Sequence, residues 1–196
     1  MPAKRPPRKK LKQVVTTMEL RELQHRPAPL PLNTKVALLR AERPTVSFYR
    51  YLYNTIGESA FWCERRQLDD DAIGALLADP EIEIYVLYVG GVPAGFAELD
   101  LRETDEIELA YFGLIPEFLG PGLADYLLGW VVDEAWRRGP ARLWLSTTNF
   151  EHPTVLAAYQ KAGFLAVGQQ THQIDDPRAT GVLPKDVAVP HAALAE

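Results

Sequence analysis

Hydrophobic and polar positions along the chain follow two different periods, which predict a mixture of strands and helices. Period-two alternation or short β-branched runs predict strands at residues 14–20, 82–89, 94–101, 105–115, 142–147 and 164–171. Apolar residues that recur every three or four positions predict helices at residues 45–56, 69–77, 123–138 and 153–162. This order predicts an α/β (α+β) fold with a mixed, mostly antiparallel twisted sheet flanked by helices.

Turn-forming residues separate these elements. Gly90 and Gly91 stand between two predicted strands and indicate a tight hairpin. Residues 25–32 contain three prolines and are expected to form a loop. The strand at 142–147 follows a helical crossover, so we expect it to lie parallel to the strand at 105–115.

The predicted elements place one domain at residues 13–172. Residues 1–12 carry six basic and no acidic side chains and are expected to form a disordered tail. Residues 173–196 are rich in proline and alanine and are expected to be a loose tail, partly packed around 177–183. Without residues 1–12, the chain has 15 basic and 26 acidic residues, a net charge of −11. Such an acidic body disfavours nucleic-acid binding.

Composition narrows the cellular setting. Cys63 is the single cysteine, which excludes an internal disulfide and suits a reducing cytoplasm. No apolar run approaches the roughly 18–20 residues of a membrane span, and no secretory signal pattern follows the basic start. The four histidines have no ligand spacing, so we expect no metal.

The segment from Ile107 to Leu128 carries the most specific chemical signal. Its apolar strand ends before Pro116, and the sequence LGPGLA at residues 119–124 then opens into an amphipathic helix. Backbone N–H groups at the start of a helix bind phosphate well. Taken alone, the loop favours an ordinary glycine-rich helix start over a phosphate site.

The spacing of this loop resembles a signature of the GNAT family of acetyl-CoA-dependent N-acetyltransferases. That signature is Arg or Gln, two residues of any type, Gly, any residue, then Gly or Ala. Gly122 and Ala124 match it, whereas Leu119 replaces the Arg or Gln.

A second GNAT signature has Asn, then Tyr seven residues later, followed by Gly-Phe. Tyr159, Gly163 and Phe164 match it, whereas His152 replaces the Asn. The chain also resembles a bacterial branch of the family in its Phe-Trp pair at 61–62 and its His-Pro before the last long helix. The resemblance covers about residues 14–172.

The resemblance implies that acetyl-CoA is the co-substrate. Backbone groups of residues 119–125 would hold its pyrophosphate: Leu119, Gly120, Gly122, Leu123, Ala124 and Asp125. A bulged strand would contact the pantetheine arm and thioester through Phe112, Gly113 and Leu114, where the glycine would permit close approach. His152 would either contact CoA or complete the helix start.

The resemblance also implies a catalytic pair. The acceptor amine must lose a proton before it attacks, and Glu108 is the first candidate base, with Glu98 on the neighbouring strand as the second. Either acid could instead be only solvated or paired with arginine. Tyr159 would protonate the leaving thiolate, although periodicity alone favours a core tyrosine.

The acceptor pocket is expected from residues 54–66 and the strand tips. This loop offers Phe61, Trp62, Glu64, Arg65 and Arg66. An aromatic wall beside acids suits a cationic amine, although Phe61 and Trp62 could equally be ordinary core residues.

The sequence thus predicts an N-acetyltransferase that moves an acetyl group from acetyl-CoA to a primary amine by direct attack in a ternary complex. The acceptor would be a small molecule or a peptide, and the protein a monomer or homodimer. The alternative is a non-catalytic acyl-CoA-binding sensor, which the departures at Leu119 and His152 favour. A nucleic-acid module that uses the basic tail is a third possibility.

Overall fold

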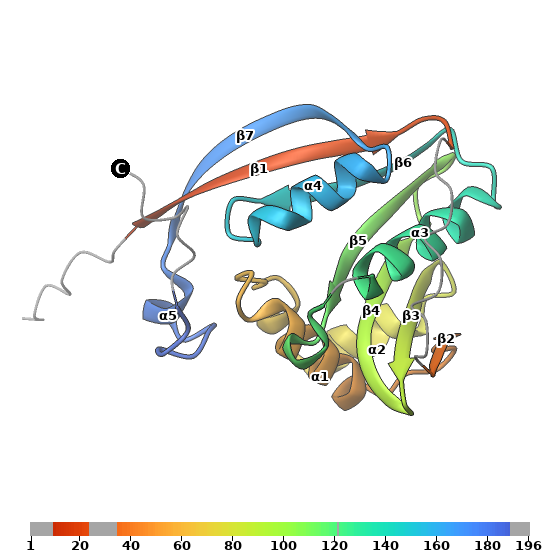
Figure 1. Cartoon of the computed structure of the whole chain (residues 1–196). Coiled ribbons are helices and arrows are strands. Elements are labelled where there is room, and N and C mark those ends of the chain that lie inside the picture. Colours follow the sequence, from red (N-terminus) through yellow and green to blue (C-terminus); the bar gives the residue numbers. More distant parts are fainter. Residues whose placement is uncertain (1–9, 24–34, 121, 189–196) are drawn as a thin grey trace, which may run out of the picture.

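The computed structural model describes residues 10–23, 35–120 and 122–188 (Figure 1). Its strands are β1 (Lys10–Leu20), β2 (Val36–Arg40), β3 (Ile82–Val89), β4 (Val92–Asp100), β5 (Glu106–Leu114), β6 (Arg142–Thr148) and β7 (Leu165–Asp175). Its helices are α1 (Val46–Gly57), α2 (Asp70–Ala78), α3 (Leu123–Trp136), α4 (Pro153–Lys161) and α5 (Pro177–Thr180), with short 3₁₀ turns at Arg65–Gln67 and Pro116–Phe118. The predicted mixed α/β class is confirmed.

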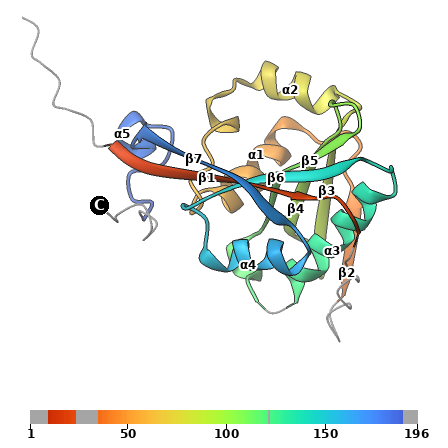
Figure 2. The same ribbon diagram turned by 90° about the horizontal axis from the view of Figure 1, so that it is seen from above.

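The strands form one sheet in the order β2-β3-β4-β5-β6-β1-β7. All neighbouring strands are antiparallel except β5 and β6, which are parallel, as the crossover through α3 predicted. Helices α1 and α2 cover one face of the sheet, and α3 and α4 cover the other (Figure 2). Two apolar clusters fill these two layers.

Several boundaries differ from the sequence prediction. β2 was not predicted, because this five-residue edge strand is too short and too exposed to show a clear period. β1 begins at Lys10 and β7 continues to Asp175, so the predicted limits of 13 and 172 cut both strands. Residues 1–9 and the predicted loop at 25–32 lie outside the described residues.

The segment after β7 is more ordered than a loose tail. β1 and β7 form a long curved ribbon whose far end carries α5 (Figure 1). There Leu183 joins Leu11, Phe61 and Phe150 in a third buried cluster, and the Arg178 guanidinium lies 5.9 Å from the centre of the Phe61 ring. The C-terminal segment therefore supports the loop that follows α1.

The pairing between β5 and β6 is short. It joins Glu106 to Arg142, Ile107 to Leu143 and Glu108 to Trp144. Beyond these three pairs the two strands separate. The resulting gap in the middle of the sheet is the feature around which the site is built.

A β-bulge lies at the start of this gap. Glu98 pairs with Tyr111 and Leu99 with Leu109, which leaves Ala110 as the extra residue of β5. Because of this insertion, Glu108 and Tyr111 point to the same face of the sheet as α1, while Leu109 and Phe112 pack toward α3 and α4.

None of the described helices is both long enough and apolar enough to cross a membrane.

The third cluster gives a test of the C-terminal packing. Leu183 is only 2% exposed, so Leu183→Ala should lower the free energy of unfolding by about 2–4 kcal/mol through lost burial and a residual cavity. Leu165 is 71% exposed, and Leu165→Ala should change the free energy by about 0.5 kcal/mol or less. Urea unfolding of both variants measures the difference, and equal effects would show that the segment is not packed.

Candidate active site

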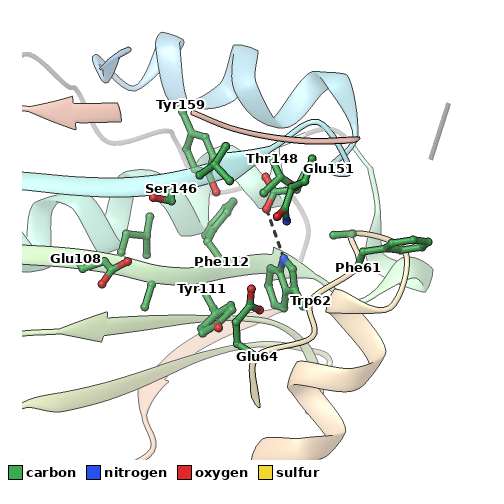
Figure 3. A pocket seen from close by; sticks show the side chains of 15 residues that line it. Phe61, Trp62, Glu64, Glu108, Tyr111, Phe112, Ser146, Thr148, Glu151 and Tyr159 are labelled. Atoms are coloured by element: carbon green, nitrogen blue, oxygen red, sulfur yellow. Dashed lines mark hydrogen bonds between the residues drawn. The ribbon is translucent and has the colours of Figure 1, made fainter. Parts of the chain in front are cut away.

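A cavity of about 290 Å³ occupies the gap between β5 and β6 (Figure 3). We call it the splay cavity. Its described lining comes from β1, the loop after α1, β5, β6, the β6–α4 connection and α4: Gln13, Val15, Ala60, Phe61, Trp62, Glu64, Glu108, Leu109, Ala110, Tyr111, Phe112, Ser146, Thr148, Glu151 and Tyr159. It brings together residues from distant parts of the sequence, including Glu108 and Tyr159.

Glu108 lies where the pairing of β5 with β6 ends. Burial raises the pKa of its carboxyl to about 7, and the nearby charges of Asp100 and Glu98 add to this effect. Within the part of the chain that the structure describes, the carboxylate makes no hydrogen bond or ion pair. A half-buried carboxyl with a pKa near neutrality can accept a proton from a substrate.

Glu98, the other acidic candidate, is fully buried. It accepts hydrogen bonds from the Tyr49 hydroxyl at 2.5 Å and the Arg65 guanidinium at 2.7 Å, and the latter contact is also an ion pair. Both carboxylate oxygens are therefore engaged, and Glu98 does not line the splay cavity.

Tyr159 points from α4 into the splay cavity (Figure 3). It is 4% exposed, and its ring lies 6.1 Å from that of Phe112 and 6.0 Å from that of Phe164. Burial, with a smaller contribution from the charge of Glu151, raises the pKa of the phenol well above its usual value of 10. The phenol therefore holds its proton at neutral pH.

The bulged part of β5 supplies backbone to the cavity. Residues 108–112 line it, including Phe112, whereas Gly113 and Leu114 lie outside the lining. Gly113 has a packing role on the α1 side of the sheet. A Cβ at Gly113 would lie 2.4 Å from the Ile56 Cγ2 atom, so this glycine permits close packing of α1 on the sheet.

Glu151 is a cavity residue that the sequence reasoning did not identify. Its carboxylate accepts hydrogen bonds from the Thr147 hydroxyl at 2.5 Å and the Trp62 indole N–H at 3.4 Å. Burial raises the pKa of this carboxyl. The available signal was an acid directly before the His-Pro that starts a helix, and an acid near a helix start is by itself common.

The glycine-rich loop leads into α3 through Gly122, which has a φ of 92° and is the N-cap residue. No side chain caps this helix start, so the N–H groups of Leu123, Ala124 and Asp125 are available to an anion. A Cβ at Gly120 would meet nothing within 4 Å. The space and the donors therefore fit a phosphate group.

Leu119 and Asp125 lie at the two ends of this loop and differ in polarity. Leu119 is 69% exposed and offers no polar group where the signature has Arg or Gln. Asp125 forms an exposed ion pair with Lys161 at 2.6 Å, which connects α3 to α4.

His152 completes the start of α4. It is the N-cap residue, and its Nδ1 atom accepts a hydrogen bond from the Thr154 N–H at 3.3 Å. An asparagine side chain can cap a helix in the same way, so the imidazole supplies the same type of helix cap.

The loop after α1 forms the wall of the cavity opposite Glu108. Phe61 adopts a φ of 58°, a strained value for a non-glycine residue. Trp62 packs against Tyr53 and Tyr111, with ring centres 5.4 and 4.9 Å apart. Phe61 and Trp62 are thus both core residues and cavity-lining residues. Arg66 binds the backbone carbonyl of Asn54 instead of the cavity.

No group of three or more His, Cys, Asp or Glu side chains within residues 10–23, 35–120 and 122–188 could hold a metal ion.

Comparison with known proteins agrees with this geometry. A family model described as the acetyltransferase (GNAT) family matches residues 45–164. No curated protein sequence matches the chain.

Solved structures share the fold at low sequence identity. The ribosomal-protein-S18-alanine N-acetyltransferase of Escherichia coli has a TM-score of 0.55 and 19% identity, over 68% of this chain and 80% of its own. A GCN5-related N-acetyltransferase from Sphaerobacter thermophilus has a TM-score of 0.57 and 18% identity, over 86% of this chain and 53% of its own. An aminoglycoside N-acetyltransferase in complex with CoA has a TM-score of 0.52 and 18% identity, over 71% and 94%.

The chain is shorter than some of these relatives. It spans 62% of a functionally unknown conserved protein from Staphylococcus epidermidis, to which it is 20% identical with a TM-score of 0.50.

The raised pKa of Glu108 predicts an effect on stability. The folded protein holds a proton on this carboxyl up to a pKa of about 7, whereas the unfolded chain releases it near pH 4.3. Glu108 therefore makes the free energy of unfolding fall as pH rises from about 4.3 to 7. We expect Glu108→Gln to gain about 1–2 kcal/mol over wild type between pH 4.5 and pH 8, after allowance for solvent screening.

Urea unfolding at both pH values measures this gain. Glu42→Gln removes one carboxylate at an exposed position outside the cavity and serves as the control. A gain that does not change with pH would show that Glu108 is not buried as the structure describes.

Proposed function

The chain belongs to the acetyltransferase (GNAT) family, and from this premise we propose that it transfers an acetyl group from acetyl-CoA to a primary amine. The observation that carries the proposal is the joint presence of Glu108 and Tyr159 on one cavity. One is a carboxyl with a pKa of about 7, and the other is a phenol that stays protonated. A base and an acid with separated pKa values suit the two proton transfers that the reaction needs.

The co-substrate would bind through backbone groups. The start of α3 supports a pyrophosphate site, because Gly122, Leu123 and Ala124 present an uncapped helix start. The pantetheine arm would then enter the gap between β5 and β6, where β5 has lost its strand partner. Its amides would pair with the strand edge of residues 110–112.

The chemistry would proceed by direct attack. Glu108 takes a proton from the acceptor ammonium, and the free amine attacks the thioester carbonyl. Backbone N–H groups at the bulge around Ala110 stabilise the tetrahedral oxyanion. As the C–S bond breaks, Tyr159 gives its proton to the departing thiolate, and the resulting phenolate takes up the excess proton of the former amine nitrogen, which leaves a neutral amide and a neutral thiol.

We assign the base to Glu108 and a structural role to Glu98. The Glu98 carboxylate is held by Arg65 and Tyr49 in a buried ion pair. Both carboxylate oxygens are engaged in these contacts, which leaves Glu98 poorly placed to meet the acceptor amine.

A sensor that binds acetyl-CoA without turnover is the second candidate. The exposed Leu119 favours it, because a side-chain contact to the cofactor is missing there.

Calorimetry with acetyl-CoA, followed by a free-thiol assay over a panel of primary amines, separates these functions. We expect binding and thiol release, with a kcat that rises with pH through about 7 as Glu108 loses its proton. Glu108→Gln and Tyr159→Phe should each lower kcat by about 10²–10⁴-fold, whereas Tyr51→Phe, at a residue 46% exposed, should not. Binding without thiol release from any amine would instead support the sensor.

The cofactor loop has its own matched test. Gly122 and Gly139 both have a positive φ, 92° and 69°, so alanine at either position should cost roughly 1–2 kcal/mol of stability. Gly139 lies at the turn after α3, away from the proposed phosphate site. Gly122→Ala should weaken acetyl-CoA binding about tenfold or more, and Gly139→Ala should leave it unchanged. Equal affinity in both variants would contradict the assignment of the loop.

A further inference from the structure

Glu108 borders a second hollow besides the splay cavity. This hollow has a volume of about 400 Å³ and is lined by Asp100, Arg102, Glu103, Glu108 and Trp144. We call it the Trp144 hollow. Its volume suits a small organic molecule. Glu108 is the one residue that the two described linings share, so its carboxyl can meet a different molecule from each side.

Strand pairing fixes the floor of the Trp144 hollow. Asp100 of β4 lies opposite Glu108 of β5, which lies opposite Trp144 of β6. Residues opposite one another in a sheet project to the same face. Leu143 and Leu145, on either side of Trp144, are buried in the layer of α3 and α4. The indole of Trp144 and the carboxyl of Glu108 are therefore neighbours on the opposite face, at the last pair before the strands separate.

The Trp144 hollow lies at the end of β5 that is remote from the proposed cofactor loop. β5 runs from Glu106 to Leu114, and the glycine-rich loop and α3 follow its C-terminal end. A pantetheine arm that enters from α3 would pass the bulge before it comes near Glu108. The rim of the hollow is instead the turn that precedes β5. The hollow therefore stays free for an acceptor while the splay cavity holds the cofactor.

Trp144 offers an aromatic surface that the protein itself uses little. It is partly buried, and no other aromatic ring within residues 10–23, 35–120 and 122–188 packs against it. The Arg142 guanidinium lies 5.7 Å from its ring centre, and Glu106 holds that guanidinium at 2.6 Å. Such a surface in a cavity lining favours a flat or apolar group.

The charges around this surface are already paired or exposed. The Arg102 guanidinium donates to both carboxylate oxygens of Asp100, at 3.0 Å and 2.5 Å. Glu103 is exposed, so water screens its charge. A second cation on the acceptor would lose hydration in the hollow without gaining a buried partner. The lining therefore favours an acceptor whose body has no charge.

We propose that the acceptor is a primary amine with a flat, uncharged body, such as an arylalkylamine, whose body packs on Trp144 and whose amine lies at Glu108. This inference rests on the proposed acetyl transfer. Trp144 determines specificity by binding and takes no part in the proton transfers. A contact made equally to the substrate and the transition state lowers KM and leaves kcat unchanged.

Two measurements on three amines test the proposal. The flat amine is 2-phenylethan-1-amine, the short amine is ethanamine, and the dication is butane-1,4-diamine. Calorimetry on the protein saturated with CoA measures binding, and the free-thiol assay with acetyl-CoA measures kcat and KM. We expect the wild type to bind 2-phenylethan-1-amine about tenfold or more tightly than either other amine. The values of kcat/KM should follow the same order.

Substitutions of Trp144 identify the surface. Trp144→Ala should weaken binding of 2-phenylethan-1-amine about tenfold and raise its KM by a similar factor, with a change of less than about threefold for ethanamine. Trp144→Phe keeps an aromatic ring and should retain most of the affinity. Trp136→Ala removes a partly buried tryptophan of α3 outside both linings and should leave binding unchanged. Thermal unfolding checks that each variant is folded.

The outcomes separate this proposal from acetyl transfer. If the wild type binds 2-phenylethan-1-amine no better than the other amines, the assignment of the hollow is overturned, whether or not thiol is released. A folded Trp144→Ala variant that keeps the preference also overturns it. Thiol release at equal kcat/KM from all three amines leaves acetyl transfer in place and contradicts the flat acceptor. A binding preference that Trp144→Ala abolishes, without thiol release from any amine, supports the hollow and contradicts acetyl transfer.

Discussion

The rest of the structure depends on the point at which β5 and β6 stop pairing. After Glu108 and Trp144 the two parallel strands diverge, and the backbone polar groups along the exposed edge of β5 lose their strand partner. In the middle of a seven-stranded sheet such a gap costs hydrogen bonds, so it is stable only where side chains fill it or a ligand pairs with the edge. Tyr159 and Phe112 fill part of it, and the remaining space is the splay cavity.

Charge is organised around the same gap. On the α1 face, Arg65 holds Glu98 next to the bulge, and both Glu98 and Asp100 help to keep the pKa of Glu108 high. The Glu98 carboxylate therefore raises the pKa of Glu108 without lining the cavity, whereas its partner Arg65 lowers that pKa. This division explains why two acids on neighbouring strands would have different roles, a distinction that residue type alone does not make.

The sequence predicted the order of most elements, because segments such as α3 and β6 have a clear period of hydrophobic residues. It predicted the site only in part. Strict alternation would place Glu108, Ala110 and Phe112 on one face of the sheet. The bulge at Ala110 forms where β5 pairs with β4, and it changes which face the following side chains point to. Glu151 enters the site through Thr147 and Trp62. Trp62 lies far from Glu151 in sequence, and no local pattern encodes that contact. The packing of Leu183 against Phe61 is non-local in the same way.

The two departures from the GNAT signatures lie at residues 119 and 152, beside two helix starts. At residue 119 a polar side chain is lost, yet the left-handed Gly122 and the uncapped start of α3 remain. At residue 152 an imidazole replaces an amide, yet Nδ1 still caps the helix that carries Tyr159. Both positions keep the backbone geometry and change only the side chain. Backbone geometry can therefore preserve the helix start, on which the proposed phosphate site depends. Specificity would be free to vary in the loop after α1, where the strained Phe61 and its neighbours Trp62 and Glu64 face the cavity.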